Sequence, residues 1–95
     1  MVIFTWDEGK HRENLKKHGM DFRDVPEMFA GPMLVYLDNR EDYGEDRYWG
    51  LGFIRGRPMV VIFTELEPET LRVISLRKAS RHEEARLKEA LAVRN

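Results

Sequence analysis

The chain has 95 residues, a length that suits one domain with a single core, so we expect residues 1–95 to fold as one domain. With 42% hydrophobic and 35% charged residues, it has the composition of a soluble globular protein, without a membrane-spanning run or a signal-peptide pattern. The lack of cysteine excludes disulfides, thiolate metal sites and cysteine nucleophiles, and favours a cytoplasmic location.

The net charge of −1 is unevenly distributed along the chain. Residues 1–20 carry four Lys/Arg against three Asp/Glu, residues 21–46 two against eight, and residues 47–95 ten against six. The overall balance disfavours a sheet-based DNA binder. A basic half beside an acidic stretch instead indicates a local anion site and a surface for a basic partner.

The N-terminal stretch predicts an edge or second-layer strand at Val2–Trp6, followed by a helix over Glu8–His18. Asp7 is a suitable N-cap and Gly19 a suitable residue just past the helix end. Leu15 is the only large apolar residue of this helix. A helix so polar must bridge other elements or present side chains.

Apolar residues then recur at helical spacing, which predicts a second helix from about Phe22 to Ala30. Its regular part should start near Asp24, with Pro26 in the first turn, and end at Gly31-Pro32. We expect its apolar side chains in the core: Phe22, Val25, Met28 and Phe29.

The rest of the chain predicts a meander of antiparallel strands and a closing helix. The strands are expected at Met33–Asp38, Arg47–Ile54, Met59–Glu65 and Leu71–Arg77, joined by an acidic loop at Asn39–Asp46 and turns at Arg55–Pro58 and Glu67–Thr70. The helix runs from Arg81 to about Val93 with a thin apolar stripe. The fold class is therefore α+β, with a four-stranded antiparallel sheet, a short N-terminal strand, two N-terminal helices and one C-terminal helix.

Ser80 and Glu83 have the spacing of a capping box, which marks the start of the last helix. Arg77 and Lys78 precede it directly, at the end of a strand. Backbone N–H groups and basic side chains can converge on one anion at such a place. The alternative is that both residues simply end the strand in solvent.

Known metal and cofactor motifs do not fit the sequence. His11 and His18 lie about 10 Å apart along one helix, too far to share an ion. Zinc-protease, phosphate-loop, dinucleotide-binding and nucleophile-elbow patterns are missing. We therefore expect neither a metal nor a cofactor.

A set of basic residues on the sheet remains as the candidate site. Arg47, Arg72 and Arg77 lie on strands, and Lys78 and Arg81 follow. Arg72 and Arg77 are five residues apart, so a regular strand points them to opposite faces. Both can serve one site only if a β-bulge turns the Arg77 side chain to the face of Arg72. Otherwise we take Arg77 as the functional residue and Arg72 as structural.

A site of arginine and lysine without a metal suits RNA cleavage by the RNA's own 2′-hydroxyl. Arg77, Arg47 and Lys78 can stabilise the phosphorane, and His18 is the first candidate for proton transfer. Glu45 and Lys10 are the reserves for that role.

Aromatic side chains can stack on RNA bases. Of the three candidates, we expect Trp6 at the core or its edge, and Tyr48 and Trp49 on opposite faces of one strand. The residues assigned to RNA binding are Arg72, Lys10, Trp6, Tyr48 and Arg81.

Motifs along nearly the whole chain resemble the BrnT toxin family. The opening matches at Phe4-Thr5-Trp6-Asp7, Lys10, Asn14, Lys17-His18-Gly19 and Phe22; the later matches are Gly44-Glu45, Arg47-Tyr48, Gly50, Val60–Thr64, Arg72–Ala79 and Glu83. The resemblance implies a RelE-like fold and a type II toxin–antitoxin module whose toxin is a small ribonuclease. It also implies a DNA-binding antitoxin as partner, an RNA substrate, and operator DNA bound only through the antitoxin. The family positions that point to the site are Trp6, Asp7, Lys10, His18, Glu45, Arg47, Arg72, Arg77 and Lys78.

Two hypotheses therefore compete. One is a metal-independent endoribonuclease toxin, and the other is a non-catalytic domain that binds an antitoxin or another partner. An exposed, mutually reachable cluster of Arg47, Arg77 and Lys78 would favour the enzyme. Burial of each residue in its own salt bridge would favour the binding domain.

Overall fold

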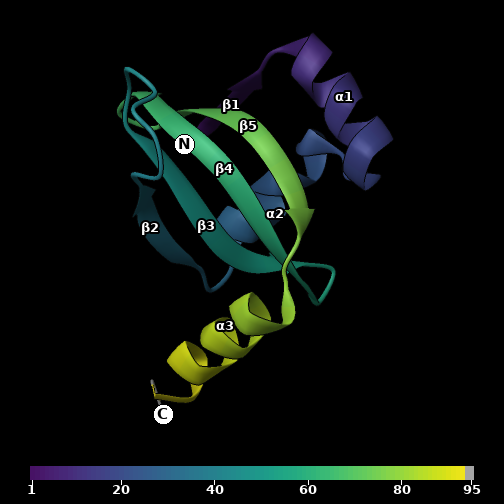
Figure 1. Cartoon of the computed structure of the whole chain (residues 1–95), viewed down its shortest axis with the longest axis vertical. Coiled ribbons are helices and arrows are strands. Elements are labelled where there is room, and N and C mark those ends of the chain that lie inside the picture. The colour runs from purple at the N-terminus through teal and green to yellow at the C-terminus, as the bar shows by residue number, and fades with distance from the viewer. Residues whose placement is uncertain (94–95) are drawn as a thin grey trace.

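The computed structural model describes residues 1–93, apart from the side chain of Val93. Its elements, in chain order, are β1 (Ile3–Trp6), α1 (Glu8–His18), a 3₁₀ turn at Phe22–Asp24, α2 (Val25–Ala30), β2 (Leu34–Asp38), β3 (Arg47–Ile54), β4 (Arg57–Glu67), β5 (Thr70–Lys78) and α3 (Arg81–Val93). Figure 1 shows α1 beside β5, α2 behind the sheet and α3 beyond one end of it. No helix among the described residues is long and apolar enough to cross a lipid bilayer.

The sheet has five strands in the order β1-β5-β4-β3-β2. β2 to β5 form the predicted antiparallel meander. The N-terminal strand is not a separate layer: β1 lies parallel to β5, with Ile3 opposite Thr70 and Trp6 opposite Val73. The predicted α+β class is confirmed, with one more strand in the sheet than the four of the meander.

The helix boundaries follow the capping signals in the sequence. Asp7 accepts a hydrogen bond from the Lys10 backbone N–H, and Gly19 ends α1 with a φ of 68°. The second helix begins as the 3₁₀ turn and becomes regular at Val25, with Asp24 at its N-cap and a proline in its first turn. The Asp24 side chain makes no cap bond and pairs instead with Arg55.

The β3–β4 turn is tighter than the predicted four-residue turn at 55–58. Arg55 and Gly56 both have positive φ, 50° and 76°, the two-residue geometry whose twist matches an antiparallel hairpin. Arg57 and Pro58 therefore already belong to β4, and Pro58 pairs with Phe53.

Each face of the sheet carries its own core. The face covered by α1 and α2 holds the larger cluster: Phe22, Val25, Met28, Ile54, Met59, Val61, Phe63, Leu71, Val73 and Leu76. Among the described residues, α3 covers one end of the other face, where Leu87 packs on Leu51 and Val60. The remainder, which we call the open face, is left for polar side chains.

A β-bulge at Ile74 decides which β5 side chains reach the open face. Ser75 pairs with Ile62 and Val73 with Phe63, so Ile74 is an extra residue without a partner on β4. Val73 and Leu76, three residues apart, consequently both enter the larger core. The same one-residue shift places Arg72 and Arg77 on one face of the sheet. From the sequence alone it was open whether they share a face.

The polar helix α1 is attached to the sheet by Asn14. Beyond Val73, the edge of β5 has no further partner on β1. There the Asn14 amide accepts a hydrogen bond from the Leu76 N–H (3.0 Å) and donates one to the Leu76 carbonyl (2.8 Å). It also donates to the Met20 carbonyl. The helix therefore bridges elements, as its polar surface predicted.

We predict that Asn14→Ala lowers the free energy of unfolding by about 3 kcal/mol, because it leaves the buried N–H and C=O of Leu76 without partners. Urea denaturation measures this. Asn39→Ala, in an exposed loop, is the matched control and should stay within about 0.5 kcal/mol of the parent. Equal effects of the two variants would contradict the role given to Asn14.

Candidate active site

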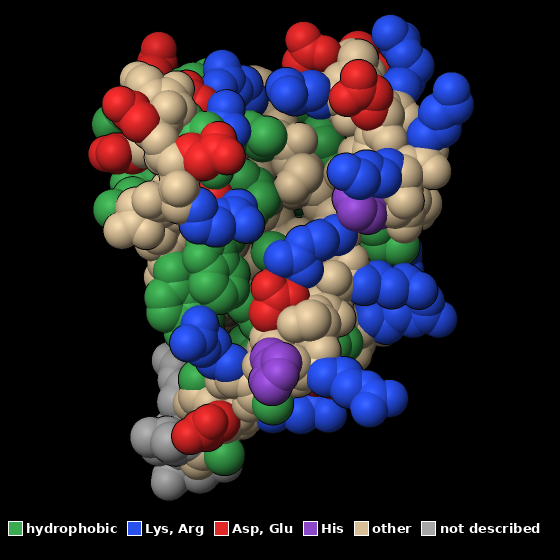
Figure 2. Space-filling model, in the orientation of Figure 1, with side chains coloured by type: hydrophobic (Ala, Val, Ile, Leu, Met, Phe, Trp, Pro, Cys, Tyr) green, Lys and Arg blue, Asp and Glu red, His purple; other side chains and the backbone are tan. Residues whose placement is uncertain are grey.

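The open face combines a stripe of arginines with aromatic and aliphatic side chains. The strand register places Asp38, Arg47, Thr64 and Arg72 in one row across the four antiparallel strands. The next row holds Tyr36, Trp49, Ile62 and Ser75, and the one after it Leu34, Leu51, Val60 and Arg77. Figure 2 shows basic and acidic side chains together over these strands, beside an apolar patch.

Glu45 joins two of the predicted arginines. Its carboxylate accepts hydrogen bonds from Arg72 Nη2, at 2.7 and 3.0 Å, and from Arg47 Nε at 3.2 Å. The Arg47 guanidinium also lies over the ring of Tyr43, 4.1 Å from its centroid. Arg47, Arg72 and Glu45 thus form one half-buried cluster.

The acidic loop that carries Glu45 is tied to the sheet at both ends. Near its start, the buried carboxylate of Asp38 accepts hydrogen bonds from Arg40, which keep the pKa of Asp38 below its ordinary value. At its end, the Thr64 hydroxyl donates to the Asp46 carbonyl at 2.7 Å. These contacts position both Arg40 and Glu45 over the sheet.

Arg77 meets a carboxylate where the sequence predicted an anion site. Its guanidinium donates two hydrogen bonds to Glu83, at 2.8 and 2.9 Å, and Glu83 also accepts the Ser80 backbone N–H at 2.7 Å. The Ser80 hydroxyl accepts the Glu83 N–H, so the capping box is confirmed. In this structure the anion at the strand end is therefore the carboxylate of the chain's own Glu83.

The hydrogen bonds from Arg77 lower the pKa of Glu83 from its ordinary 4.5 to about 2, with a further contribution from the Ser80 N–H. Reciprocally, the carboxylate raises the pKa of Arg77. The positive charge of Arg40 is close enough to lower the pKa of Arg77. A cavity lies between them, lined by Arg40, Trp49, Ile62, Arg77 and Glu83.

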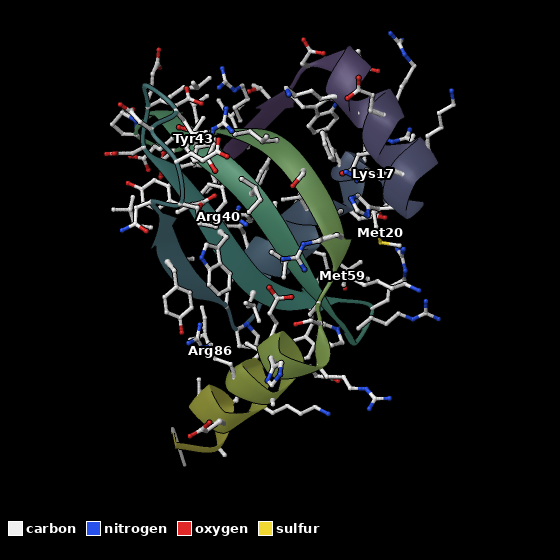
Figure 3. All side chains as sticks on the ribbon, viewed as in Figure 1. Lys17, Met20, Arg40, Tyr43, Met59 and Arg86 are labelled. Atoms are coloured by element: carbon white, nitrogen blue, oxygen red, sulfur yellow. The ribbon has the colours of Figure 1, made fainter. Side chains whose placement is uncertain are left out.

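His18 and Lys10 lie in a neighbouring groove rather than among the arginines. The groove separates α1 from β5 and is lined by Lys10, Glu13, Asn14, Lys17, His18, Ile74 and Ser75. Figure 3 labels Lys17 on the side of α1 that faces the sheet. Ser75 belongs to both the groove and the open face, because the bulge turns it outward.

Besides His18 and Lys10, four further predicted site residues do not lie on the arginine stripe. Tyr48 and Trp6 face the helical core: Tyr48 stacks on Phe63, and Trp6 lies edge-on to Phe22. Lys78 pairs with Met59 of that same core, so the sheet separates it from Arg77. Arg81 is exposed at the first residue of α3.

The sequence did not single out Arg40 or Glu83 as site residues, and Trp49 was not assigned to RNA binding. Trp49, not Tyr48, is the aromatic residue of the open face. Strand alternation predicted that Tyr48 and Trp49 lie on opposite faces of the sheet, but not which of them lies on the open face. Glu83 was visible only as a helix cap, and Arg40 only as one basic residue in an acidic loop.

Metal-binding groups were also sought within the described part of the chain. Across residues 1–93, no three histidine, aspartate or glutamate side chains are grouped so that they could hold a metal ion. The charge of the open face is carried by its guanidinium groups.

Comparison with known proteins identifies the family. A family profile described as "Ribonuclease toxin, BrnT, of type II toxin-antitoxin system" matches residues 6–83. The crystal structure of the Brucella abortus ribonuclease toxin BrnT is 34% identical, covers 85% of this chain and 100% of its own, and superposes with a TM-score of 0.67. The search of curated protein sequences gives no match.

The α+β fold and these matches define a ribonuclease toxin of a type II toxin–antitoxin system, a class in which the toxin has an antitoxin partner. The chain belongs to the BrnT family of these toxins.

We predict that acid removes the contribution of the Arg77–Glu83 pair to stability. Because the pKa of Glu83 is lower in the folded protein, this contribution is complete above pH 4.5 and is lost as the pH falls toward 2. Glu83→Gln, which retains a capping-box acceptor, should cost about 1 kcal/mol near neutral pH and progressively less below pH 4.5. Denaturant unfolding at several pH values, with the exposed Glu89→Gln as control, measures the difference. A constant deficit across this range would disprove the linkage.

Proposed function

We propose that this toxin cleaves RNA on the open face of its sheet, by attack of the 2′-hydroxyl on the adjacent phosphate and without a metal ion. The observation that carries the proposal is the bulge at Ile74, which puts Arg72 and Arg77 on the same face as Arg47. Three guanidinium groups on one surface suit a phosphate whose charge grows in the transition state.

The reaction needs two proton transfers besides charge stabilisation. A base removes the 2′-proton, the 2′-oxygen bonds to phosphorus, and the bond to the 5′-oxygen breaks as that oxygen takes a proton. The products are a 2′,3′-cyclic phosphate and a 5′-hydroxyl. The role of the arginines is to stabilise the phosphorane between these steps.

Glu45 is the residue we propose as general base, because its carboxylate lies between Arg47 and Arg72. Glu83 suits this role less well, since a carboxylate with a pKa near 2 holds a proton weakly. His18 is proposed as the general acid, from the groove that shares Ser75 with the open face. Lys10 and Lys17 of that groove extend the basic surface for the RNA backbone.

A second candidate function is a non-catalytic binding domain. It is favoured by the ion pairs themselves, because Arg40, Arg47, Arg72 and Arg77 each already contact a carboxylate of the chain. These pairs are only partly buried, however, with Arg77 37% and Arg72 38% exposed. An RNA phosphate can therefore replace the carboxylates at modest cost.

We further propose that the antitoxin is a DNA-binding protein, that the complex reaches operator DNA only through it, and that the toxin acts in the cytoplasm. The acidic stretch 39–46 is the surface we assign to a basic partner segment. Its carboxylates lie next to the arginine stripe, so a partner bound there would also restrict access of RNA.

Purified protein in excess EDTA is expected to cleave single-stranded RNA and leave 2′,3′-cyclic phosphate ends. Arg77→Ala should reduce the cleavage rate by roughly 100-fold or more, because one donor to the developing charge is lost. Arg77→Lys should recover only part of that rate, since lysine lacks the two-pronged donor geometry. Gel electrophoresis of end-labelled RNA measures the rates and identifies the ends.

Arg12→Ala is the matched control, because Arg12 is exposed on α1 away from the open face and should leave the rate unchanged. An equal loss in the Arg12 and Arg77 variants would point to nonspecific charge effects. A folded parent protein that cleaves no free RNA would refute the free-RNA nuclease and leave a ribosome-dependent enzyme or the binding domain.

A further inference from the structure

Trp49 lines the cavity of the open face. Tyr36, its partner on β2, stacks on the indole with the ring centroids 4.6 Å apart. Ile62, its partner on β4, lines the cavity together with Trp49. Trp49 therefore lies between Tyr36 on β2 and the cavity-lining Ile62 on β4.

This aromatic pair is supported from outside the site. The Arg86 guanidinium of α3 lies over the Tyr36 ring, 5.2 Å from its centroid. Figure 3 shows Arg86, Arg40 and Tyr43 along one side of the open face, with Arg40 between the other two. The order Arg86, Tyr36, Trp49 is thus a stacked series that ends at the cavity.

The cavity has room for one flat ring, so a purine base would place one of its two fused rings in it. Its volume is about 160 Å³, and an engineered protein cavity of about 150 Å³ admits benzene. The indole of Trp49 and the side chain of Ile62 supply apolar walls. A nucleobase can stack on such a wall whatever its identity, because every base has a π face.

The polar groups around the cavity are mainly hydrogen-bond donors. Within residues 1–93, the Nε and Nη2 of Arg40 donate to Asp38, and the rest of its guanidinium group borders Tyr43 and the cavity. Arg77 uses Nη1 and one Nη2 hydrogen on Glu83 and the Lys78 carbonyl, which leaves Nε. The Glu83 oxygens already accept from Arg77 and the Ser80 N–H.

A donor-rich wall selects a base that presents acceptors. Guanine offers O6 and N7 side by side, the pair that a guanidinium group binds through two hydrogen bonds. Adenine offers N7 beside an amino group, which would face the arginine donors. We propose that this cavity binds one unpaired guanine of the RNA substrate, stacked on Trp49 and recognised through its O6 and N7 by the Arg40 guanidinium.

This inference rests on the proposed function but concerns binding, so it is tested without cleavage. The probes are fluorescently labelled RNA oligonucleotides with 2′-O-methyl groups throughout, which lack the attacking hydroxyl. One has a single guanine among adenines, and the others replace that guanine by inosine, adenine or an abasic spacer. Fluorescence anisotropy at fixed salt measures the dissociation constants.

We expect the parent protein to bind the guanine and inosine oligonucleotides about equally, and roughly tenfold more tightly than the adenine and abasic ones. Trp49→Leu should weaken guanine binding roughly tenfold without affecting the abasic probe, whereas Trp49→Phe should change it less than threefold. Arg40→Lys should preserve abasic binding and reduce the preference for guanine over adenine. Thermal unfolding of each variant establishes that it is folded.

Equal affinity of the parent for the guanine and abasic probes would overturn the base site, even if the protein cleaves RNA. So would a Trp49→Leu variant that is folded yet weakens all probes alike. Binding of the predicted kind by a protein that cleaves nothing would retain this inference and remove the nuclease proposal. If no probe binds, both fail together.

Discussion

The β-bulge at Ile74 is the constraint on which the rest of the site depends. One extra residue in β5 lets Val73 and Leu76 share the main core while Arg72 and Arg77 share the open face. A regular strand would satisfy neither pair, because residues three or five apart point to opposite faces of the sheet. The amide of Asn14 holds the strand directly after the bulge, so the polar helix α1 also serves the geometry of the arginine stripe.

The open face resolves an apparent conflict between charge and function. A net charge of −1 is unusual for a chain expected to hold an RNA backbone. The structure distributes this charge as pairs, in which Glu45, Glu83 and Asp38 each neutralise a guanidinium group. The carboxylates keep the arginines ordered and partly desolvated before any substrate arrives. Under the proposed function, a phosphate that replaces them meets groups already in position.

The pairing of arginines with carboxylates explains why residue types alone did not distinguish a ribonuclease from a non-catalytic binding domain. The criterion was whether the arginines lie exposed and together or are each buried in a separate ion pair. Arg47 and Arg77 share the open face, each in an ion pair with a carboxylate of the chain, whereas Lys78, the third residue of the criterion, lies on the other side of the sheet. The Glu83 carboxylate has two roles, since it caps the start of α3 and also occupies the anion site next to Arg77.

The sequence by itself determined the order and type of nearly all elements, because caps, turns and apolar periodicity act over a few residues. Asp7, Gly19 and the Ser80–Glu83 box marked helix ends correctly. It also pointed to Arg47, Arg72 and Glu45, which lie in contact. Tertiary structure alone determined on which face of the sheet each side chain lies. The bulge at Ile74 depends on the pairing of β4 with β5, and no local pattern encodes it. For that reason Tyr48 and Lys78 were assigned to the site although they face the core side. Arg40 was recognised as a site residue, and Trp49 rather than Tyr48 as the aromatic residue of the open face, only in the folded structure.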